Sequence, residues 1–438
     1  MSRASKIGTL FFFGLSAAAS LAPLPLVAQA PAATVTGKLT SIKFKGSLRY
    51  AQAGLLAAGG LASGQQIGIQ DLQAAADRLS GLGLFRHVRF TFTSLGEDVS
   101  VVYELEDGPT VPVYFDNFPW FTDEELSAAL KSQFPLFDGT APEDGAMLEQ
   151  MAAALQSLLA SRNVSATVQR QLIGRPGADG MMQQFHIIGP ALKVGAVRFE
   201  HPLAAGDKRI NALLSELIGK PYSRFTTELF AFEHLRPVYL ERGHLRAEFG
   251  PPQVRFTGDP RKPLPDNVLV VVPIAPGPAY TWGGAAWTGI SVHSSDALNT
   301  WLGLAPGDIV DGMKLTAAWE RIRAEYGRLG HLDASLDISP AFDPAAARVS
   351  YRIAVTEGVQ YRMGELVLTG LSMNAERTLR SAWQVLPGQV FDRVWFDDFV
   401  ATGIRRLFSD TPVHFTKIGP LLQPNAETGI VSVFLDFQ

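Results

Sequence analysis

One short pattern recurs five times along this chain, and it constrains the fold more than any other feature. Each copy is an alternating apolar run that ends at a turn residue; the turn residues are Gly46, Asn117, His201, Gly289 and Gly370. In four copies a glycine follows eighteen positions later, at Gly64, Gly219, Gly307 and Gly388. A repeat of roughly 70 to 90 residues has the length of a small domain and is too long for one solenoid unit.

Each copy predicts elements in the order β-α-α-β-β. Period-two alternation places the apolar side chains of the first strand on one buried face. A first helix follows the turn, at residues 51–58 in the first copy and 375–383 in the fifth. The second helix begins after a capping residue and carries an apolar stripe at helical spacing. The caps are Ser223, Asp311 and Asp392, and the stripes are Leu72, Ala75 and Leu79 in the first copy and Leu315, Trp319, Ile322 and Tyr326 in the fourth.

Glycines mark the end of the second helix, and two further strands close each copy. Gly83, Gly243 and Gly330 stand where a helix commonly ends in the left-handed conformation. The third strand is predicted at residues 99–105, 267–272, 349–355 and 430–437. The predicted fold class is therefore α+β: five tandem domains in an extended array, each a three-stranded mixed sheet with two helices on one face.

The repeat divides the chain into five predicted domains. Their bounds are 36–108, 109–190, 191–277, 278–358 and 359–438. The second domain is the most divergent, because no glycine stands eighteen positions after Asn117. Its turn is expected to adopt positive φ, which asparagine tolerates better than most residues. His201 also departs from the glycine pattern, which makes the third turn different from the others.

The first thirty residues have the features of a secretory signal peptide. Arg3 and Lys6 precede an apolar stretch, and Ala28-Gln29-Ala30 offers a small-x-small cleavage site. The alternative is an N-terminal anchor, which needs about 20 continuous apolar residues. Pro23 and Pro25 interrupt the stretch too early for that. We therefore expect residues 1–30 to be cleaved and the mature chain to lack a transmembrane segment.

Composition narrows the function further. The chain has no cysteine, so each domain needs its own hydrophobic core without disulfides. Its formal net charge of −4 and balanced acids and bases give no signature of nucleic-acid binding. No H-E-x-x-H metal motif, phosphate loop or G-x-S-x-G elbow is present, so we expect no enzyme, cofactor or metal. His244 and His331 occupy equivalent positions, which a repeated turn explains better than metal ligation.

These motifs resemble those of the POTRA (polypeptide-transport-associated) domain. Matching stretches are residues 40–46, 63–65 and 83–85, and residues 361–370 look especially like the entry of such a domain. Gly195, Gly283 and Gly364 each stand six residues before a turn. Five such domains resemble the periplasmic arm of outer-membrane barrel-assembly proteins, without their C-terminal β-barrel. The resemblance implies a periplasmic location at the outer membrane, with outer-membrane barrel proteins or their precursors as partners. A separately encoded assembly barrel could be a further partner.

The exposed edge of each sheet is the candidate binding site, because an edge strand pairs readily with an extended peptide. In the family the second strand is the usual edge, which implies edges here at residues 86–93, 245–250, 331–338 and 412–417. The candidate residues are Arg86, Val88, Arg89, Phe90, Leu245, Ala247, Leu332, Ala334, Val413 and Phe415. The alternative is that a neighbouring domain or solvent covers each edge, and that Arg86, Arg89 and Lys417 prevent pairing.

Two hypotheses follow for the function. The first is a non-enzymatic scaffold or chaperone-like module in outer-membrane protein assembly or secretion, which binds extended polypeptides or partner subunits at sheet edges. The second is a structural spacer of an envelope complex that binds one folded partner. The two differ in whether unfolded precursors bind to the edges.

Overall fold

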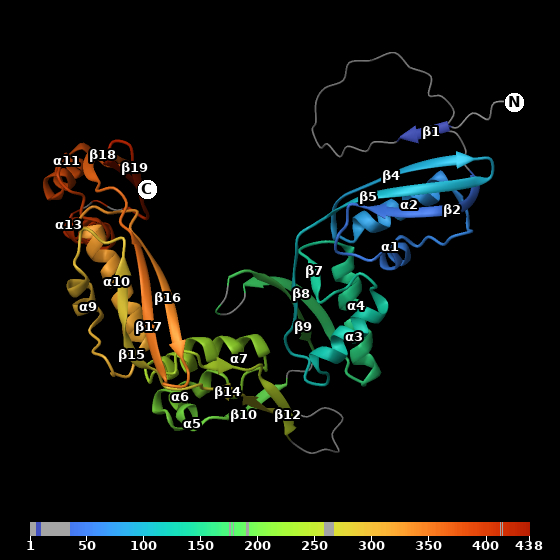
Figure 1. Cartoon of the computed structure of the whole chain (residues 1–438), viewed down its shortest axis with the longest axis horizontal. Helices are drawn as coiled ribbons and strands as arrows, with labels where there is room; N and C mark the ends of the chain where they lie inside the picture. The colour runs from blue at the N-terminus through green and yellow to red at the C-terminus, as the bar shows by residue number, and fades with distance from the viewer. Residues whose placement is uncertain are drawn as a thin grey trace, which may run out of the picture. The chain divides into compact units, whose positions relative to one another are not determined.

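The computed structural model describes residues 6–9, 36–174, 177, 179–189, 192–257, 267–411, 413 and 415–438. Most of the predicted signal peptide lies outside the described residues. The chain divides into two compact units, traced in Figure 1. The first unit comprises Met1–Glu200, Lys208–Phe232 and Pro251–Pro273, and the second comprises His201–Asp207, Glu233–Gly250 and Ile274–Gln438. The division passes through the third repeat, so the five domain bounds remain a prediction.

The first repeat forms a mixed sheet in the order β1-β4-β5-β2-β3. Strand β5 is parallel to β2 and antiparallel to β4, and the short β1 pairs with the end of β4. The apolar stripe predicted for the second helix is fully buried. The elements are β1 (Lys6–Thr9), β2 (Thr36–Lys45), α1 (Gln52–Gly59), β3 (Gln66–Gly68), α2 (Ile69–Gly81), β4 (Phe85–Leu95) and β5 (Asp98–Asp107).

The second repeat keeps the β-α-α-β-β order despite its divergent sequence, with a sheet in the order β7-β6-β9-β8. Its first helix begins at a capping box. The Thr122 hydroxyl accepts from the Glu125 N–H at 3.2 Å, and the Glu125 carboxylate accepts from the Thr122 N–H at 2.9 Å. The elements are β6 (Thr110–Phe115), α3 (Asp123–Gln133), β7 (Thr140–Pro142), α4 (Ala146–Ser161), β8 (Thr167–Gly174) and β9 (Met181–Ile188).

The third repeat contributes elements to both units. Its sheet, in the order β10-β13-β12, belongs to the first unit. That unit holds β10 (Lys193–Phe199), α6 (Lys208–Leu213), η1 (Leu214–Glu216), α7 (Arg224–Phe230), β12 (Gln253–Thr257) and β13 (Asn267–Val272). The second unit holds α5 (Pro202–Gly206), α8 (Arg236–Leu240), β11 (Glu248–Phe249) and β14 (Ile274–Ala275), and the π-helical η2 (Ala231–Leu235) spans the division.

The fourth and fifth repeats lie in the second unit and share one topology. Their sheets run β15-β17-β16 and β18-β20-β19, with the third strand in the middle. The fourth repeat consists of β15 (Thr281–Thr288), α9 (Ser295–Leu302), α10 (Gly312–Arg328), β16 (Ser335–Asp343) and β17 (Arg348–Thr356). The fifth consists of β18 (Arg362–Thr369), α11 (Met373–Ala382), α12 (Arg393–Asp398), η3 (Phe399–Gly403), α13 (Ile404–Leu407), β19 (Ile418–Asn425) and β20 (Ile430–Phe437).

Sequence periodicity identifies the cores of these repeats. The predicted helix stripe of α10 is buried, and alternate residues of β17 and β20 are buried beneath the helices. The predicted caps also form, since the side chains of Ser223, Asp311 and Asp392 accept from helical N–H groups. Among the described residues, no helix combines the length and apolarity that a bilayer crossing requires.

The turn glycines permit a close approach between the first and third strands. Gly46, Gly289 and Gly370 have φ of 91°, 75° and 81°. At each, an added Cβ would overlap a carbonyl oxygen at the end of the third strand. Glycine is therefore required there for space as well as for its dihedral angle.

The two exceptional turns work differently. The expectation of positive φ at Asn117 is wrong: among the described non-glycine residues only Asn163 and Ala347 have positive φ. Instead, the Asn117 amide accepts from the Ile187 N–H at 2.6 Å and donates to the Ile187 carbonyl at 3.1 Å. Its side chain thereby joins the first strand to the third. His201, with φ of −132°, caps α5.

The glycines six residues before the turns mark bulges. The register of the first strand against the third shifts between Val194 and Ala196, between Trp282 and Ala285, and between Met363 and Leu366. Gly195, Gly283 and Gly364 lie at these three shifts. A bulge bends a strand and often contains glycine, so these positions are structural.

A buried amide in the second repeat gives a prediction about stability. Gln183 on β9 is 0% exposed, and neither amide atom has a hydrogen-bond partner among the described residues. Gln183→Met removes this unsatisfied polar group while keeping the side-chain length. We expect it to stabilise the repeat by about 1–2 kcal/mol, measured as slower hydrogen exchange in β6–β9.

The neighbouring residue provides a matched control. Gln184 is 2% exposed, but its amide oxygen accepts a hydrogen bond from the Gln171 side chain. Gln184→Met should therefore cost about 1 kcal/mol rather than stabilise. Equal effects of the two substitutions would contradict the assignment of Gln183 as unsatisfied.

Candidate functional site

The second long strand lies on the outer side of the central strand in each repeat, as the resemblance implied. These edge strands are β4, β8, β12, β16 and β19. Among the described residues, only β4 has a strand on its outer side, where β1 pairs with residues 91–94. The main-chain groups along the rest of these edges are therefore candidate sites for an added strand.

The candidate residues of the first repeat lie on an edge strand, in β4. Arg86 and Arg89 are exposed, Val88 is half-buried and Phe90 is buried at 8%. Arg86 stands at a register shift, and its guanidinium is 3.7 Å from the Glu106 carboxylate. An incoming strand would meet the main chain here, flanked by basic side chains on the open face.

The predicted edge residues of the third and fourth repeats are not on strands. Leu245 and Ala247 precede β12, and Leu332 and Ala334 precede β16. One turn occupies both places: the Leu245 N–H donates to the Gly243 carbonyl at 2.9 Å, and the Leu332 N–H donates to the Gly330 carbonyl at 3.1 Å. The predictions at 245–250 and 331–338 start too early because this turn separates helix from strand. In the fourth repeat, Asp333 indicates in the sequence that the strand begins later, because aspartate is disfavoured in strands.

The predicted edge of the fifth repeat is also wrong. Val413 and Phe415 precede β19, and residues 412 and 414 lie outside the described residues. Phe415 packs into the core, with its ring centroid 5.3 Å from that of Phe437 and 5.9 Å from that of Phe408. The true strand contains Pro420 and Pro424, and proline usually argues against a strand.

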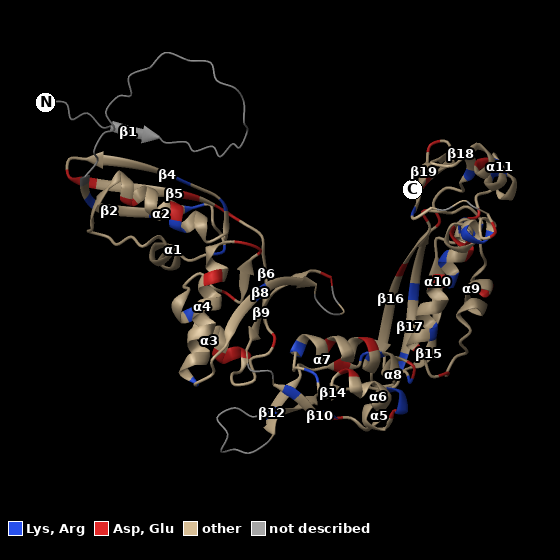
Figure 2. Cartoon of the chain, turned by 180° about the vertical axis from the view of Figure 1, so that it is seen from behind, with Lys and Arg blue, Asp and Glu red and all other residues tan. Residues whose placement is uncertain are grey.

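The edges differ in how well they could accept a peptide. Strand β16 contains Pro340, and β19 contains Pro420 and Pro424, each of which removes a main-chain donor. Strand β4 is longer, at 11 residues, and contains no proline. Figure 2 shows the positions of Lys and Arg and of Asp and Glu interspersed along the described strands and helices. Edge chemistry therefore favours β4 over β16 and β19 as a site of strand addition.

The equivalent histidines have structural roles. The His244 Nδ1 lies 3.0 Å from the Gly277 carbonyl oxygen, and the His331 Nδ1 lies 3.1 Å from that of Glu357. Each ring thus links the turn before an edge strand to the segment that follows the third strand. Within the part of the chain that the structure describes, no group of three or more His, Cys, Asp or Glu side chains could hold a metal.

A partly buried polar cluster joins the second and third repeats within the first unit. The Arg224 guanidinium donates to both Asp123 oxygens at 2.8 Å and to Glu228 at 3.0 Å. It also lies 5.2 Å from the centroid of the Tyr114 ring, whose hydroxyl donates to Glu228 at 2.9 Å. Burial lowers the pKa of Arg224, but the hydrogen bond to Asp123 and the charges of Asp123, Tyr114 and Glu228 together raise the pKa above its usual value. Sequence reasoning missed this cluster, since its members are spread over two repeats.

Asp116 completes the junction. Its carboxylate accepts from the Ser223 hydroxyl at 3.0 Å and from the Phe225 N–H at 2.8 Å, at the start of α7. Burial raises the pKa of Asp116, and these hydrogen bonds oppose the shift. A carboxylate from the end of β6 therefore helps to cap a helix of the next repeat.

Comparison with known proteins relates part of the chain to a family. Residues 280–358, which span β15 to β17, match the POTRA family model, described as a surface antigen variable number repeat. This stretch is thus similar in sequence to a POTRA domain. Its elements give the order β-α-α-β-β that the sequence predicts for each copy.

Other relatives are similar to longer parts of the chain. Over 284 residues it is 22% identical to an outer membrane protein assembly factor of Treponema pallidum (strain Nichols), which covers 62% of this chain. The chain spans 32% of the length of that relative. Two solved structures are also similar: POTRA domains 3–5 of BamA from Haemophilus influenzae, and the N-terminal domain of Omp85 from Thermosynechococcus elongatus.

Both structures are distant from this chain. The BamA POTRA structure is 18% identical and covers 57% of this chain and 99% of its own, with a TM-score of 0.40. The Omp85 structure is 17% identical and covers 57% of this chain and 98% of its own, with a TM-score of 0.25. Such scores are too low for a residue-by-residue correspondence.

Proposed function

We propose that this protein is a non-enzymatic, periplasmic polypeptide-binding scaffold in outer-membrane protein assembly or secretion, exported with a cleaved signal peptide. The similarity of residues 280–358 to a POTRA domain and the similarity to an assembly factor support the process. Its partners would be outer-membrane proteins or their precursors. Binding would occur by addition of an extended segment to a sheet edge.

One observation carries the binding mode: the proline-free edge of β4. Its outer main-chain groups at residues 86–90 have no strand partner among the described residues. Main-chain pairing gives affinity with little dependence on sequence, which suits a module that meets many precursors. The alternative, a spacer that binds one folded partner, is supported by the prolines that interrupt β16 and β19.

Site-specific photo-crosslinking tests the proposal. A photo-reactive residue replaces Arg89, which is exposed on β4, or Ser339, which is exposed beside Pro340 on β16. A third variant carries it at Gln73, which is half-buried on α2, as a control away from any edge. We expect the Arg89 variant to capture unfolded outer-membrane precursors several-fold more than the other two.

Two outcomes would count against this function. Capture of one folded protein only would favour the spacer. Equal capture at Arg89 and Gln73 would remove the edge as the binding site, because α2 offers no unpaired main chain. Hydrogen exchange of each variant establishes that its fold is intact.

A further inference from the structure

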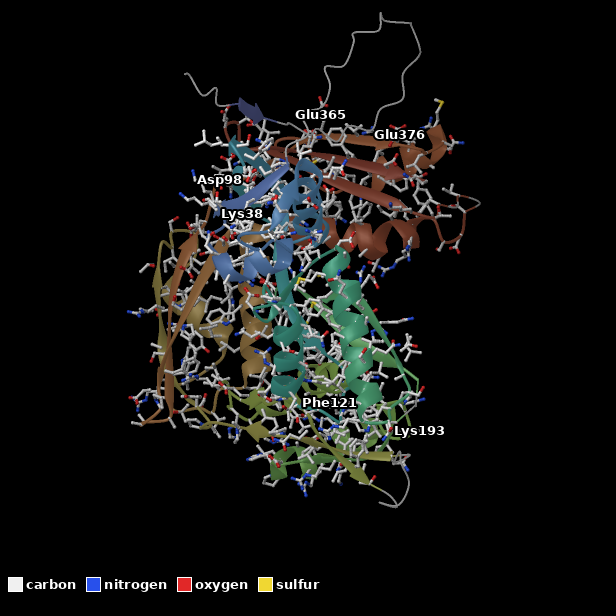
Figure 3. All side chains as sticks on the ribbon, turned by 90° about the vertical axis from the view of Figure 1, so that its right-hand side faces the viewer. Lys38, Asp98, Phe121, Lys193, Glu365 and Glu376 are labelled. Atoms are coloured by element: carbon white, nitrogen blue, oxygen red, sulfur yellow. The ribbon has the colours of Figure 1, made fainter. Side chains whose placement is uncertain are left out.

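A pocket of about 500 Å³ lies in the first unit, where the second and third repeats meet. Three elements bound it: the segment leading into α3, the start of α7 and the start of β12. Figure 3 shows Phe121 at the end of α3, where the second repeat meets the third. The pocket is separate from the β4 edge that carries the proposed function.

Aromatic rings and prolines form much of the wall. Phe118 and Tyr222 are buried, Trp120 is half-buried, and Pro251 and Pro252 close one side. The Trp120 ring lies 5.9 Å from that of Phe256, which is 43% exposed on β12. The aromatic surface therefore continues from the pocket onto the edge strand.

The same wall is strongly acidic. Among the described residues that line it, four carry carboxylates, Asp116, Asp123, Glu124 and Glu125, and one, Arg224, carries a guanidinium. Asp116, Asp123 and Glu125 bind groups of the fold, and Glu124, which is exposed, has hydrogen bonds in the described structure only within its own turn, to its main chain and to Thr122. An aromatic surface beside an excess of carboxylates is complementary to a cationic side chain.

The chain uses this chemistry twice in the immediate surroundings. The Arg162 guanidinium lies 5.1 Å from the centroid of the Phe121 ring and 3.9 Å from Glu125. Arg224 lies likewise against Tyr114 while it binds Asp123. Even with Arg162 counted, the carboxylates remain in excess. Trp120 and Glu124 both line the pocket, and neither Arg162 nor Arg224 lies on the Trp120 ring in the described contacts.

Strand β12 gives the direction from which a ligand would arrive. Its first residues, Gln253 and Val254, line the pocket, and its outer edge has no strand partner among the described residues. Arg255 alternates to the opposite face of the strand from Val254 and Phe256. A peptide paired with β12 would thus extend past the mouth of the pocket.

We propose that this pocket binds a lysine or arginine side chain of an extended polypeptide that lies along β12. The inference rests on the proposed function and adds a preference to it. Main-chain pairing alone does not distinguish one sequence from another, whereas the pocket selects segments that carry a positive charge.

Fluorescence anisotropy on the full mature chain tests the preference. The probes are two labelled peptides of alternating threonine and valine that differ only in a central lysine or glutamate. We expect the lysine peptide to bind roughly tenfold more tightly, and the preference to weaken as salt rises. Trp120→Ala and Glu124→Lys should abolish it. Glu143→Lys, the same charge change at an exposed site outside the pocket, should leave it intact.

The outcomes separate the two proposals. Equal binding of both peptides to the unmodified chain, or a preference that survives Trp120→Ala and Glu124→Lys, would overturn the pocket and leave polypeptide binding standing. Absence of binding by either peptide, together with no crosslinking at Arg89, would overturn both. If Glu143→Lys also abolishes the preference for the lysine peptide, the preference arises from the overall charge of the chain, and the pocket is not its source.

Discussion

Gly370→Ala should destabilise the fifth repeat by about 3–5 kcal/mol, a large share of the stability of a small domain. Two effects combine at this position. Its φ of 81° is unfavourable for any residue with a Cβ, which costs about 1–2 kcal/mol. In addition, the new Cβ would overlap the Phe437 carbonyl oxygen, so the end of β20 must move. Hydrogen exchange in β18–β20 measures the loss.

Gly388 is a matched control within the same repeat. It has the same φ of 81°, but apart from its two chain neighbours no atom of the described residues lies within 4 Å of the position that its Cβ would occupy. Gly388→Ala should therefore cost only the dihedral term, about 1–2 kcal/mol. If the two variants exchange at the same rate, the close approach at Gly370 does not hold. Gly370 and Gly388 would then be required for the same reason, their positive φ, and Gly370 would not also be required for space.

Arg224→Ala should destabilise the junction of the second and third repeats by about 1–3 kcal/mol, between the values for exposed and for buried ion pairs. The substitution leaves Asp123 and Glu228 without their shared cation at a site where the Arg224 side chain is only 16% exposed. It also removes the guanidinium from the Tyr114 ring. The expected result is faster exchange in both α3 and α7, because the cluster belongs to two repeats. Urea unfolding should show a lower midpoint for the same segment.

Arg323→Ala is the control for removal of an ion pair. Arg323 binds Glu320 on the surface of α10, with 38% of its side chain exposed. Exposed pairs of this kind contribute about 0.2–1 kcal/mol. A double-mutant cycle of Arg224 and Glu228 should give a coupling well above that range. Coupling energies of similar size at both sites would refute the view that burial strengthens the Arg224 cluster.

Local periodicity predicts the strands of this fold well, for a physical reason. The third strand of each repeat lies in the middle of its sheet, so one face is buried along its whole length. Burial imposes an alternation that β20 shows clearly, and the predicted bounds 267–272 and 430–437 match β13 and β20 residue for residue. The helix stripes and the Ser and Asp caps follow from equally local rules.

Edge strands are harder to predict from the sequence, because an edge strand has a neighbouring strand along one edge only. Polar residues and prolines are tolerated there, so β19 with Pro420 and Pro424 does not resemble a strand in sequence. The Gly-His-Leu turns before β12 and β16 shifted two further predictions. The Arg224 cluster and the aromatic pocket depend on contacts between residues about a hundred positions apart, which no local pattern encodes.

The bulges in the first strands tie together positions that are distant in sequence. A Cβ at Gly364 would lie 2.6 Å from Ile430 Cγ2 and 3.0 Å from Ser432 Oγ, and a Cβ at Gly195 would lie 3.1 Å from Asn267 Cβ. At Gly283 it would overlap the Ser350 hydroxyl. The two residues of each pair cannot vary independently, because a larger side chain on the first strand requires a smaller one opposite it on the third strand. Where related repeats have lost the glycine, the opposite residue on the third strand should have lost its bulk.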